Sequence, residues 1–387
     1  MSKKILILTF YYKPDLSAGS FRMTAFVEEL KKIVSDNDQI DIITTLPNRY
    51  NTFNKNAKKI EKYNNITIYR VELSKHKSGF IDQSYLFLQY AIAVFKILRT
   101  KKKYDIVFAT SSRLMTAFLG SLVKRHTQAK LYLDIRDIFT DTLNSIFEKS
   151  KVKHIIPLFK IVEKYTINSA DCINLVSEGF SEYFQNINPN IKYSFYPNGV
   201  DEIFINTSFE KKREDKKKVI TYAGNIGEGQ GLEKIIPNMA KFLGSEYEIK
   251  IIGDGGTKIK LANAVKGLEN VKIIPPMERS RLLKEYANSD FLFLHLNSYE
   301  AFKKVLPSKI FEYAATNKFI IAGVDGYAKE FIEKNVTASM VFTPCDINDF
   351  KSKFNKIVEV KIDRREFVKK FSRKNIMKKL AQEVYAL

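Results

Sequence analysis

The sequence has few cysteines and no long apolar run. Its two cysteines, Cys172 and Cys345, are too few and too far apart for a disulfide framework or a metal-ligand spacing, which favours a reducing, cytoplasmic compartment. The nearest approach to a membrane span, 85–98, is shorter than the ~18–20 apolar residues that a transmembrane helix needs, and it contains Gln89 and Lys96. We therefore expect no membrane-spanning helix.

Acidic residues are scarce relative to basic ones. The chain has 43 Asp and Glu against 64 Lys and Arg, a formal net charge of +21. This excess favours anionic partners such as nucleic acid, phospholipid or phosphorylated substrates, without choosing among them. With 45% hydrophobic and 28% charged residues, the composition excludes a disordered, fibrous or disulfide-scaffold class. The length of 387 residues predicts two or three domains.

Short β-branched or apolar runs alternate with amphipathic stretches, a pattern typical of βαβ units in a mostly parallel sheet. The pattern breaks at the turn cluster 196–201, which predicts two α/β halves joined near 197–205. We expect the last segment, 364–387, to form one long basic helix. The predicted strands are 4–10, 39–46, 66–73, 105–110, 130–135, 171–176, 218–223, 247–252, 271–274, 291–295 and 319–322, and the predicted helices are 18–34, 81–100, 114–126, 158–169 and 232–242.

Small residues follow several predicted strands at the starts of helices. Ser17 and Gly19 follow the first strand, the glycine-rich turn 224–231 opens the second half, and the turn 253–256 follows the next strand. Glycine lets a backbone approach a phosphate, and helix N-termini attract anions, so these turns are candidate phosphate or sugar sites. Because no G-x-G-x-x-G spacing is present, an ordinary strand–helix connection remains an alternative for the first loop.

Charged residues in the second half suggest a further site. The stretch Pro307-Ser308-Lys309 leads into a helical pattern that contains Glu312. Lys309 and Glu312 are three residues apart and share one helix face. A cation there can neutralise a phosphate, and a carboxylate can accept hydrogen bonds from sugar hydroxyls. A surface ion pair explains the same spacing, and the sequence does not decide between the two.

Two further features have both a functional and a structural interpretation. Asp137 follows the strand 130–135, where it is a candidate base or hydroxyl-orienting group, or else a helix cap. The apolar stretch 81–100 ends in three lysines, so it is either an interfacial helix that meets anionic lipid or a helix packed on the sheet. We interpret His295, at the end of a strand, as a packed side chain, and no histidines are paired at metal-ligand spacing.

Taken together, these motifs resemble the retaining family-4 glycosyltransferases, and in particular the bacterial members that build O-antigen, capsule or related polysaccharides. The resemblance covers nearly the whole chain and is carried by 14–22, 196–200, 224–227, 253–255 and 307–312. It implies the GT-B fold, two Rossmann-like domains facing each other across a cleft. The implied parts are an acceptor-binding domain at 1–200, a nucleotide-sugar-binding domain at 201–363 and a helix at 364–387 that returns to the first domain.

The resemblance also implies an activity and a set of site residues. The implied reaction moves a hexosyl or N-acetylhexosaminyl group from a nucleotide sugar, usually a UDP-sugar, and needs no cofactor beyond that co-substrate. No D-x-D pair serves a divalent ion convincingly, so we expect metal-independent transfer. The implied catalytic residues are Lys309, Glu312 and Asp137; the donor-binding residues are Gly19, Asn225, Gly227, Gln230, Asp254, Gly255, Ile274, Pro276, Leu306, Pro307, Ser308, Lys309 and Glu312; the acceptor-binding residues are Ser17, Arg22, Arg136 and Asp137.

The chain departs from the family pattern at two places. Many members carry two glutamates with seven residues between them, and the first of these positions is Lys304 here. The arginine and lysine that commonly follow the glycine turn are also missing, with Asn225 and Gln230 nearby. Lys309 is the candidate source of the missing positive charge.

The implied acceptor is a glycan on a polyprenyl-diphosphate carrier, which predicts a peripheral location on the inner face of the cell membrane. Two other functions stay open. A nucleotide-sugar epimerase of the same fold would need no lipid acceptor. A nucleic-acid-binding protein is suggested by charge alone, and because no binding module is recognisable we expect no nucleic-acid partner.

Overall fold

The computed structural model describes residues 2–15, 17–47, 57–74, 80–100, 103–111, 114–147, 154–211, 217–358 and 360–387. The chain divides into two compact units. The first comprises Met1–Asn198 with Lys374–Leu387, and the second comprises Gly199–Arg373. The domain division predicted from sequence placed these boundaries at 200 and 364.

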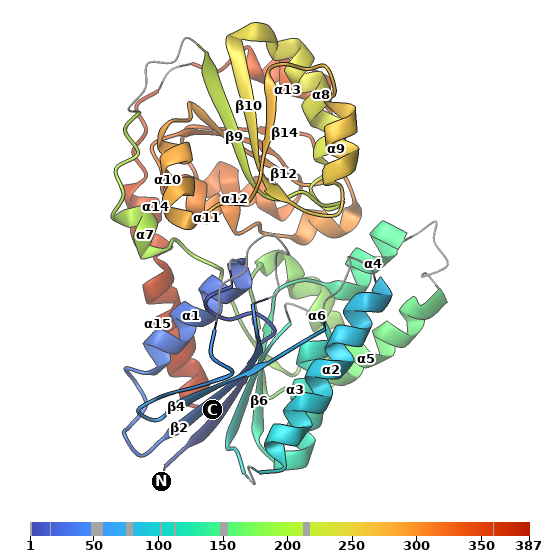
Figure 1. The fold of residues 1–387 in the computed structure, drawn as a ribbon, viewed down its shortest axis with the longest axis vertical. Helices are drawn as coiled ribbons and strands as arrows, with labels where there is room; N and C mark the ends of the chain where they lie inside the picture. The colour runs from blue at the N-terminus through green and yellow to red at the C-terminus, as the bar shows by residue number, and fades with distance from the viewer. Residues whose placement is uncertain are drawn as a thin grey trace. The chain divides into compact units, whose positions relative to one another are not determined.

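An eight-stranded sheet forms the centre of the first unit, in the order β3-β4-β2-β1-β5-β6-β7-β8 (Figure 1). All neighbouring strands are parallel except β3 and β4, which form an antiparallel pair. The central strands are buried apolar runs, as expected when helices cover both faces of a parallel sheet. The strands are β1 Lys4–Leu8, β2 Gln39–Thr45, β3 Ile60–Tyr63, β4 Ile66–Val71, β5 Ile106–Thr110, β6 Lys130–Ile135, β7 Cys172–Leu175 and β8 Lys192–Ser194.

Helices cover both faces of this sheet. Helices α1 and α15 pack on one face, where Phe26 and Leu380 belong to the same core cluster. Helices α2, α3 and α5 lie on the other side, as Figure 1 shows. The helices of this unit are α1 Ala18–Leu30, α2 Phe80–Leu98, α3 Leu114–Thr127, α4 Phe139–Phe147, α5 Ile156–Asn168, α6 Ser181–Ile187 and α15 Arg373–Tyr385, with a 3-10 turn, η2, at Glu178–Phe180.

The second unit is built on a six-stranded, fully parallel sheet in the order β11-β10-β9-β12-β13-β14. Two apolar cores lie against it, one containing Leu292 and Phe311 and the other Phe293 and Ile235. The strands are β9 Lys218–Asn225, β10 Tyr247–Asp254, β11 Val271–Ile274, β12 Phe291–His295, β13 Phe319–Gly323 and β14 Ser339–Phe342. The helices are α7 Glu202–Ile205, α8 Leu232–Leu243, α9 Lys258–Ala264, α10 Arg279–Ala287, α11 Lys309–Ala314, α12 Tyr327–Asn335, α13 Ile347–Phe354 and α14 Arg365–Lys370, with 3-10 turns η3 Gly244–Glu246 and η4 Glu300–Lys304.

The prediction of a single helix over 364–387 was wrong. The structure has two helices, α14 and α15, separated at Phe371 and Ser372. Ser372 forms a parallel bridge with Val200, whose amide donates to the Phe371 carbonyl over 2.7 Å, so the backbone is extended there and the helix cannot continue. The expected return to the first half is confirmed for α15, which completes the core of the first unit.

In each sheet the chain order reverses once, between β1 and β5 and between β9 and β12. At such a point the connections leave toward opposite faces, which opens a crevice at the carboxyl ends of the two strands. The loops after β1 and β9 carry the predicted glycine motifs. The fold therefore places those motifs at the positions where α/β sheets bind ligands.

Candidate functional site

The glycine-rich loop after β9 packs closely on the loop after β10. A side chain at Gly253 would collide with the Gly224 carbonyl oxygen, and one at Gly255, whose φ is +155°, would collide with the Ile226 carbonyl. The Ile226 amide donates to the Asp254 carbonyl over 2.9 Å. These glycines are required for close approach of the two strand ends, and they support the backbone that begins the loop 225–231.

Three residues predicted to bind the donor phosphates meet within this loop. The side-chain oxygen of Gln230 accepts hydrogen bonds from the Asn225 amide over 2.9 Å and from the Gly227 backbone amide over 3.3 Å. The loop leads into α8, a helix of 12 residues with its N-terminus at Leu232. A backbone amide that already binds a neutral oxygen at the start of a helix is suited to bind a phosphate oxygen instead.

Side chains from the end of β12 hold this loop in place. His295 is fully buried, and its Nδ1 lies 2.6 Å from the Gln230 carbonyl, while its Nε2 accepts from the Cys345 amide over 3.0 Å. Burial lowers the pKa of His295 to about 4, so the ring is neutral at pH 7 with its proton on Nδ1. The side-chain amide of Asn297 donates to the Glu228 carbonyl over 2.7 Å. The interpretation of His295 as a packed side chain is confirmed.

Lys309 and Glu312 form an ion pair that is not on the surface. Their side chains are 23% and 8% exposed, and the ammonium lies 2.6 Å from the carboxylate. The ammonium also donates to the Tyr286 hydroxyl over 3.1 Å. Burial opposes the ammonium charge, but the Glu312 carboxylate together with Tyr313 and Tyr222 outweighs burial and raises the pKa of Lys309. The site thus keeps a lysine that is charged at neutral pH beside a carboxylate.

Tyrosines connect this ion pair to strand β9. The Tyr313 hydroxyl accepts from the Ala223 amide over 3.1 Å, and the Tyr222 hydroxyl donates to the Asn225 carbonyl over 2.6 Å. The rings of Tyr286 and Tyr313 pack edge to face with centroids 5.4 Å apart. Sequence reasoning missed Tyr286, because its role depends on how α10 packs against α11 and no local pattern marks it.

The remaining predicted donor residues of the second unit lie beyond the carboxyl ends of the strands of the same sheet. Leu306 is buried in the core beneath the loop that precedes α11, and Pro307 and Ser308 are half-buried at the start of that helix. Ile274 ends β11 and packs against the same core, and Pro276 follows it, half-buried. The Asp254 carboxylate accepts from the Gly255 amide over 2.9 Å, which shapes the loop after β10.

The position of the missing first glutamate, Lys304, has no buried carboxylate at it or at the nearby Glu300. Lys304 ends the 3-10 turn η4 and is half-buried. The Glu300 side chain is 81% exposed and pairs with Lys303 over 2.7 Å. In the second unit, the buried carboxylate of this candidate site is therefore that of Glu312.

In the first unit the first turn of α1 and the loop after β6 bring Gly19 and Arg136 together. A side chain at Gly19 would lie 3.3 Å from the Arg136 guanidinium, and the Ser17 hydroxyl caps α1 by accepting from the Ser20 amide over 3.1 Å. Asp137 is solvent-exposed, yet the atoms packed around it raise its pKa to about 6, while the Arg136 guanidinium acts in the opposite direction. An aspartate that titrates near pH 6 is suited to accept a proton or orient a hydroxyl.

The placement of Arg22 corrects one prediction. Its side chain is fully buried, and it forms a bidentate pair with Asp134 over 2.8 and 2.9 Å. The guanidinium also donates to the Pro197 carbonyl over 2.8 Å. All three nitrogens are thus engaged inside the unit, so Arg22 fixes α1 to β6 rather than facing an acceptor.

The sequence of the second unit is similar to that of known proteins. Residues 204–374, somewhat under half of the chain, match the model for "Glycosyl transferases group 1". WcaI of Escherichia coli (strain K12), whose name assigns it to the colanic acid biosynthesis glycosyl transferases, is 31% identical over 117 residues. That match spans 30% of this chain and 28% of WcaI.

Solved structures match the chain over its whole length. Anabaena HepE, determined with UDP and glucose, has a TM-score of 0.71 at 16% identity and covers 100% of both chains. The trehalose-6-phosphate synthase OtsA has a TM-score of 0.72 at 12% identity, covering 100% of this chain and 99% of that one. The lipopolysaccharide outer core galactosyltransferase WaaB has a TM-score of 0.61 at 14% identity, covering 99% of each. The fold is GT-B.

The GT-B identification confirms the fold predicted from sequence. Over the described ranges, no three His, Cys, Asp or Glu side chains gather as metal ligands. In the same part of the chain, no helix has both the length and the hydropathy to cross a membrane.

Proposed function

We propose that the protein is a retaining glycosyltransferase that moves a hexosyl or N-acetylhexosaminyl group from a UDP-sugar to a glycan acceptor. The proposed acceptor is carried on polyprenyl diphosphate during synthesis of a bacterial surface polysaccharide such as O-antigen or capsule. The sequence match at 204–374 and the GT-B structures with nucleotide-sugar chemistry support this proposal.

One observation carries the proposal: Tyr286 and Tyr313 connect the Lys309–Glu312 pair, whose carboxylate is buried, to the end of β9, where the amide-rich loop 225–231 begins. A nucleotide sugar presents a diphosphate, a ribose and a sugar. Lys309 and the Gly227 amide are complementary to the diphosphate, and Glu312 is complementary to the ribose hydroxyls. The other predicted donor residues of the second unit lie near the carboxyl ends of the strands of the same sheet.

The proposed chemistry breaks the bond between the anomeric carbon of the sugar and the diphosphate oxygen. Negative charge then develops on the leaving UDP, where Lys309, the loop amides and the N-terminus of α8 would stabilise it. The acceptor oxygen forms the new bond on the face that the leaving group departs from, which retains configuration. The acceptor proton passes to the leaving diphosphate, and no metal ion is required in this scheme.

In the proposal the first unit binds the acceptor. Asp137 would orient the attacking hydroxyl, and Arg136 would bind an anionic or hydroxyl group of the acceptor. Ser17 and Gly19 would form the adjoining backbone surface. Excluding water from the reacting groups would limit hydrolysis of the donor.

The proposed location is the inner face of the cell membrane, where the protein would be peripheral. A net charge of +21 supports attraction to anionic lipid. A lipid-linked acceptor would be presented at this surface.

The first test measures thermal stabilisation and calorimetric binding with UDP, GDP, ADP and a panel of UDP-sugars. We expect selective stabilisation by UDP and one UDP-sugar, and loss of most turnover in Lys309→Ala because the leaving-group charge is then uncompensated. Lys329→Ala, an exposed lysine on α12, is the control and should keep full turnover.

Three results would count against the proposal. Absence of stabilisation by any nucleotide would remove the donor site. Near-normal turnover of Lys309→Ala would reject its role. Conversion of UDP-N-acetylglucosamine to its epimer without an acceptor would identify the protein as an epimerase instead.

A further inference from the structure

Two helices of the first unit expose apolar stripes. On α2, Tyr85, Leu88 and Ile92 recur at helical spacing and are 57%, 54% and 48% exposed. On α5, Leu158 and Ile161 are 61% and 67% exposed. Both helices contact α3, and Figure 1 shows them on the same side of the sheet. Apolar side chains grouped on neighbouring helices mark an interaction surface rather than scattered exposure.

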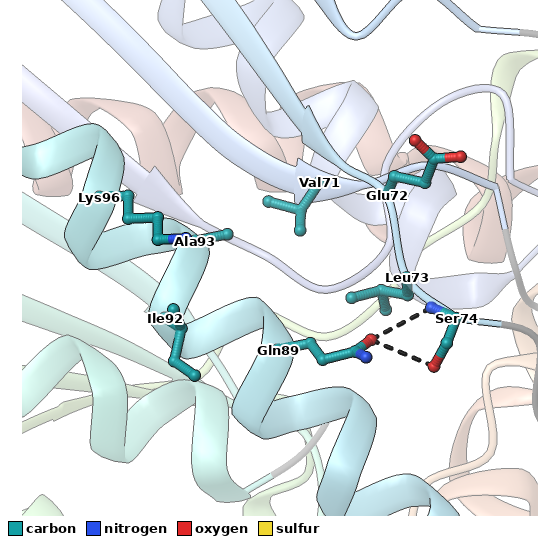
Figure 2. Close-up of a pocket in the computed structure, with 8 residues that line it drawn as sticks. All are labelled: Val71, Glu72, Leu73, Ser74, Gln89, Ile92, Ala93 and Lys96. Carbon is teal, nitrogen blue, oxygen red and sulfur yellow. Dashed lines mark hydrogen bonds between the residues drawn. The ribbon is translucent and has the colours of Figure 1, made fainter.

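An open hollow of about 490 Å³ extends the apolar surface of α2 (Figure 2). Ile92 and Ala93 line it from the helix, and Val71 and Leu73 line it from the end of β4. Ile92 belongs both to the stripe and to the wall of the hollow. The apolar side chains of α2 therefore adjoin those at the end of β4, in a hollow that is also lined by Glu72, Ser74, Gln89 and Lys96.

The exposed charged side chains of α2 and α5 beside these stripes are basic, and Glu72, the exposed carboxylate that lines the hollow, pairs with Lys59 over 2.6 Å. Lys96 continues the α2 stripe by one turn, and Lys160 and Lys164 flank the α5 stripe; all three are exposed. The acidic residues of α2, α3 and α5 are Asp82 and Glu163. Glu163 is buried, and Asp82 lies at the opposite end of α2 from Lys96. An apolar surface bordered by lysines is complementary to a surface that is apolar inside and anionic at its boundary.

We infer that α2 and α5 form a docking face for an anionic phospholipid bilayer. The apolar side chains enter the boundary between headgroups and acyl chains, and the lysines bind lipid phosphates. A second copy of this chain is disfavoured, because a two-fold contact would bring two lysine-bearing faces together and their like charges would repel. The inference rests on the proposed function in one respect, since a lipid-linked acceptor requires the protein to work at a membrane.

The test is co-sedimentation of the full chain with vesicles of equal parts phosphatidylglycerol and phosphatidylcholine, and with phosphatidylcholine alone. We expect binding to the mixed vesicles that weakens at high salt. The double variants Leu88→Gln/Ile92→Gln and Lys160→Gln/Lys164→Gln should each lower the apparent affinity about tenfold. The controls are Ile259→Gln, an exposed apolar residue on α9, and Lys329→Gln/Lys334→Gln on α12.

The outcomes separate the two proposals. No binding to mixed vesicles, or equal binding by all variants, would overturn the docking face. Self-association of the parent chain that both double variants abolish would assign the face to a second copy. Thermal stabilisation by UDP is measured without vesicles, and we expect every variant to keep it. Loss of the UDP response in the parent, with vesicle binding intact, would overturn the proposed function alone.

Discussion

Individual side chains acquire their chemistry from their surroundings, as Lys309 and Glu312 illustrate. Their spacing in the chain fits an exposed ion pair equally well, but the structure leaves the Glu312 side chain only 8% exposed. The Tyr286 hydroxyl then holds Lys309 from a helix elsewhere in the chain. Asp137 likewise differs from an ordinary aspartate because the atoms around it raise its pKa to about 6.

The raised pKa of Asp137 predicts an acid limb in the pH profile. If its carboxylate orients the acceptor, turnover should fall about tenfold per pH unit below pH ~6, where the group is protonated. Asp137→Asn should lower turnover about 100-fold or more and remove that limb. The measurement is initial rate against pH with saturating donor.

Asp36→Asn is the matched control. Asp36 is exposed and lies between α1 and β2, at the end of the sheet opposite to the loop after β1. It should keep the parental rate and profile. A parental profile in Asp137→Asn would exclude a role for this carboxylate in turnover.

At the scale of elements, the candidate donor site depends on short helix α11 being held at both ends. Lys309 and Glu312 lie in its first turn, and the buried Arg364 binds its last turn. The Arg364 guanidinium donates to the Tyr313, Thr316 and Lys318 carbonyls over 2.9 to 3.3 Å, and also to the Thr337 and Ala338 carbonyls. A six-residue helix is unstable alone, so these tertiary contacts determine that it forms.

Replacing Arg364 should therefore destabilise the second unit strongly. In Arg364→Met the buried carbonyls lose their donors, at a cost of about 3–5 kcal/mol in the free energy of unfolding. The neighbouring Arg365→Met is the control, because the Arg365 side chain is 89% exposed and pairs only at the surface with Asp363. It should cost less than about 0.5 kcal/mol.

Urea unfolding followed by circular dichroism measures both variants. Equal midpoints for the Arg364 and Arg365 variants would show that the carbonyl cluster does not need the guanidinium. UDP binding, measured by calorimetry under conditions where Arg364→Met is still folded, should be weaker than in the parent because α11 loses its fixed position.

At the scale of the whole molecule, the C-terminal segment completes the first unit. The Glu383 carboxylate on α15 accepts from the Ser194 hydroxyl over 2.6 Å and from the Tyr196 hydroxyl over 2.7 Å. Burial opposes its ionisation, but these hydrogen bonds prevail and lower the pKa of Glu383 below its ordinary value. Segments nearly two hundred residues apart thus share one carboxylate.

Because its pKa is lowered in the folded state, Glu383 stabilises the fold above its unfolded pKa near 4.5, and this stability is lost as the pH falls through the folded value. Glu383→Gln should lower the free energy of unfolding at pH 7 by about 1–3 kcal/mol. The difference from the parent should shrink below pH ~4.5.

The measurement is urea unfolding at neutral and at acidic pH, with the exposed Glu330→Gln as control. If the difference in unfolding free energy between the parent and Glu383→Gln grew as the pH fell, the result would contradict a lowered pKa for Glu383 in the folded state.

Much of the fold and part of the site follow from local patterns in the chain. Alternating apolar and amphipathic segments predicted two parallel α/β halves, and glycines at strand ends marked the loops after β1, β9 and β10. The five strands predicted for the second half agree with β9 to β13 within two residues at each end. The short edge strands β3, β8 and β14 were missed; β3 and β8 also carry charged residues in place of an apolar run.

The sequence alone determined which residue types stand at the strand ends, because glycine, proline and charge act on the backbone nearby. Only the tertiary structure decided which of them meet. The break at Ser372 needs Val200, the pair of Arg22 needs Asp134, and the placement of Lys309 needs Tyr286. Each of these contacts joins segments distant in the chain, and its energy depends on burial that arises only when the sheets and helices pack.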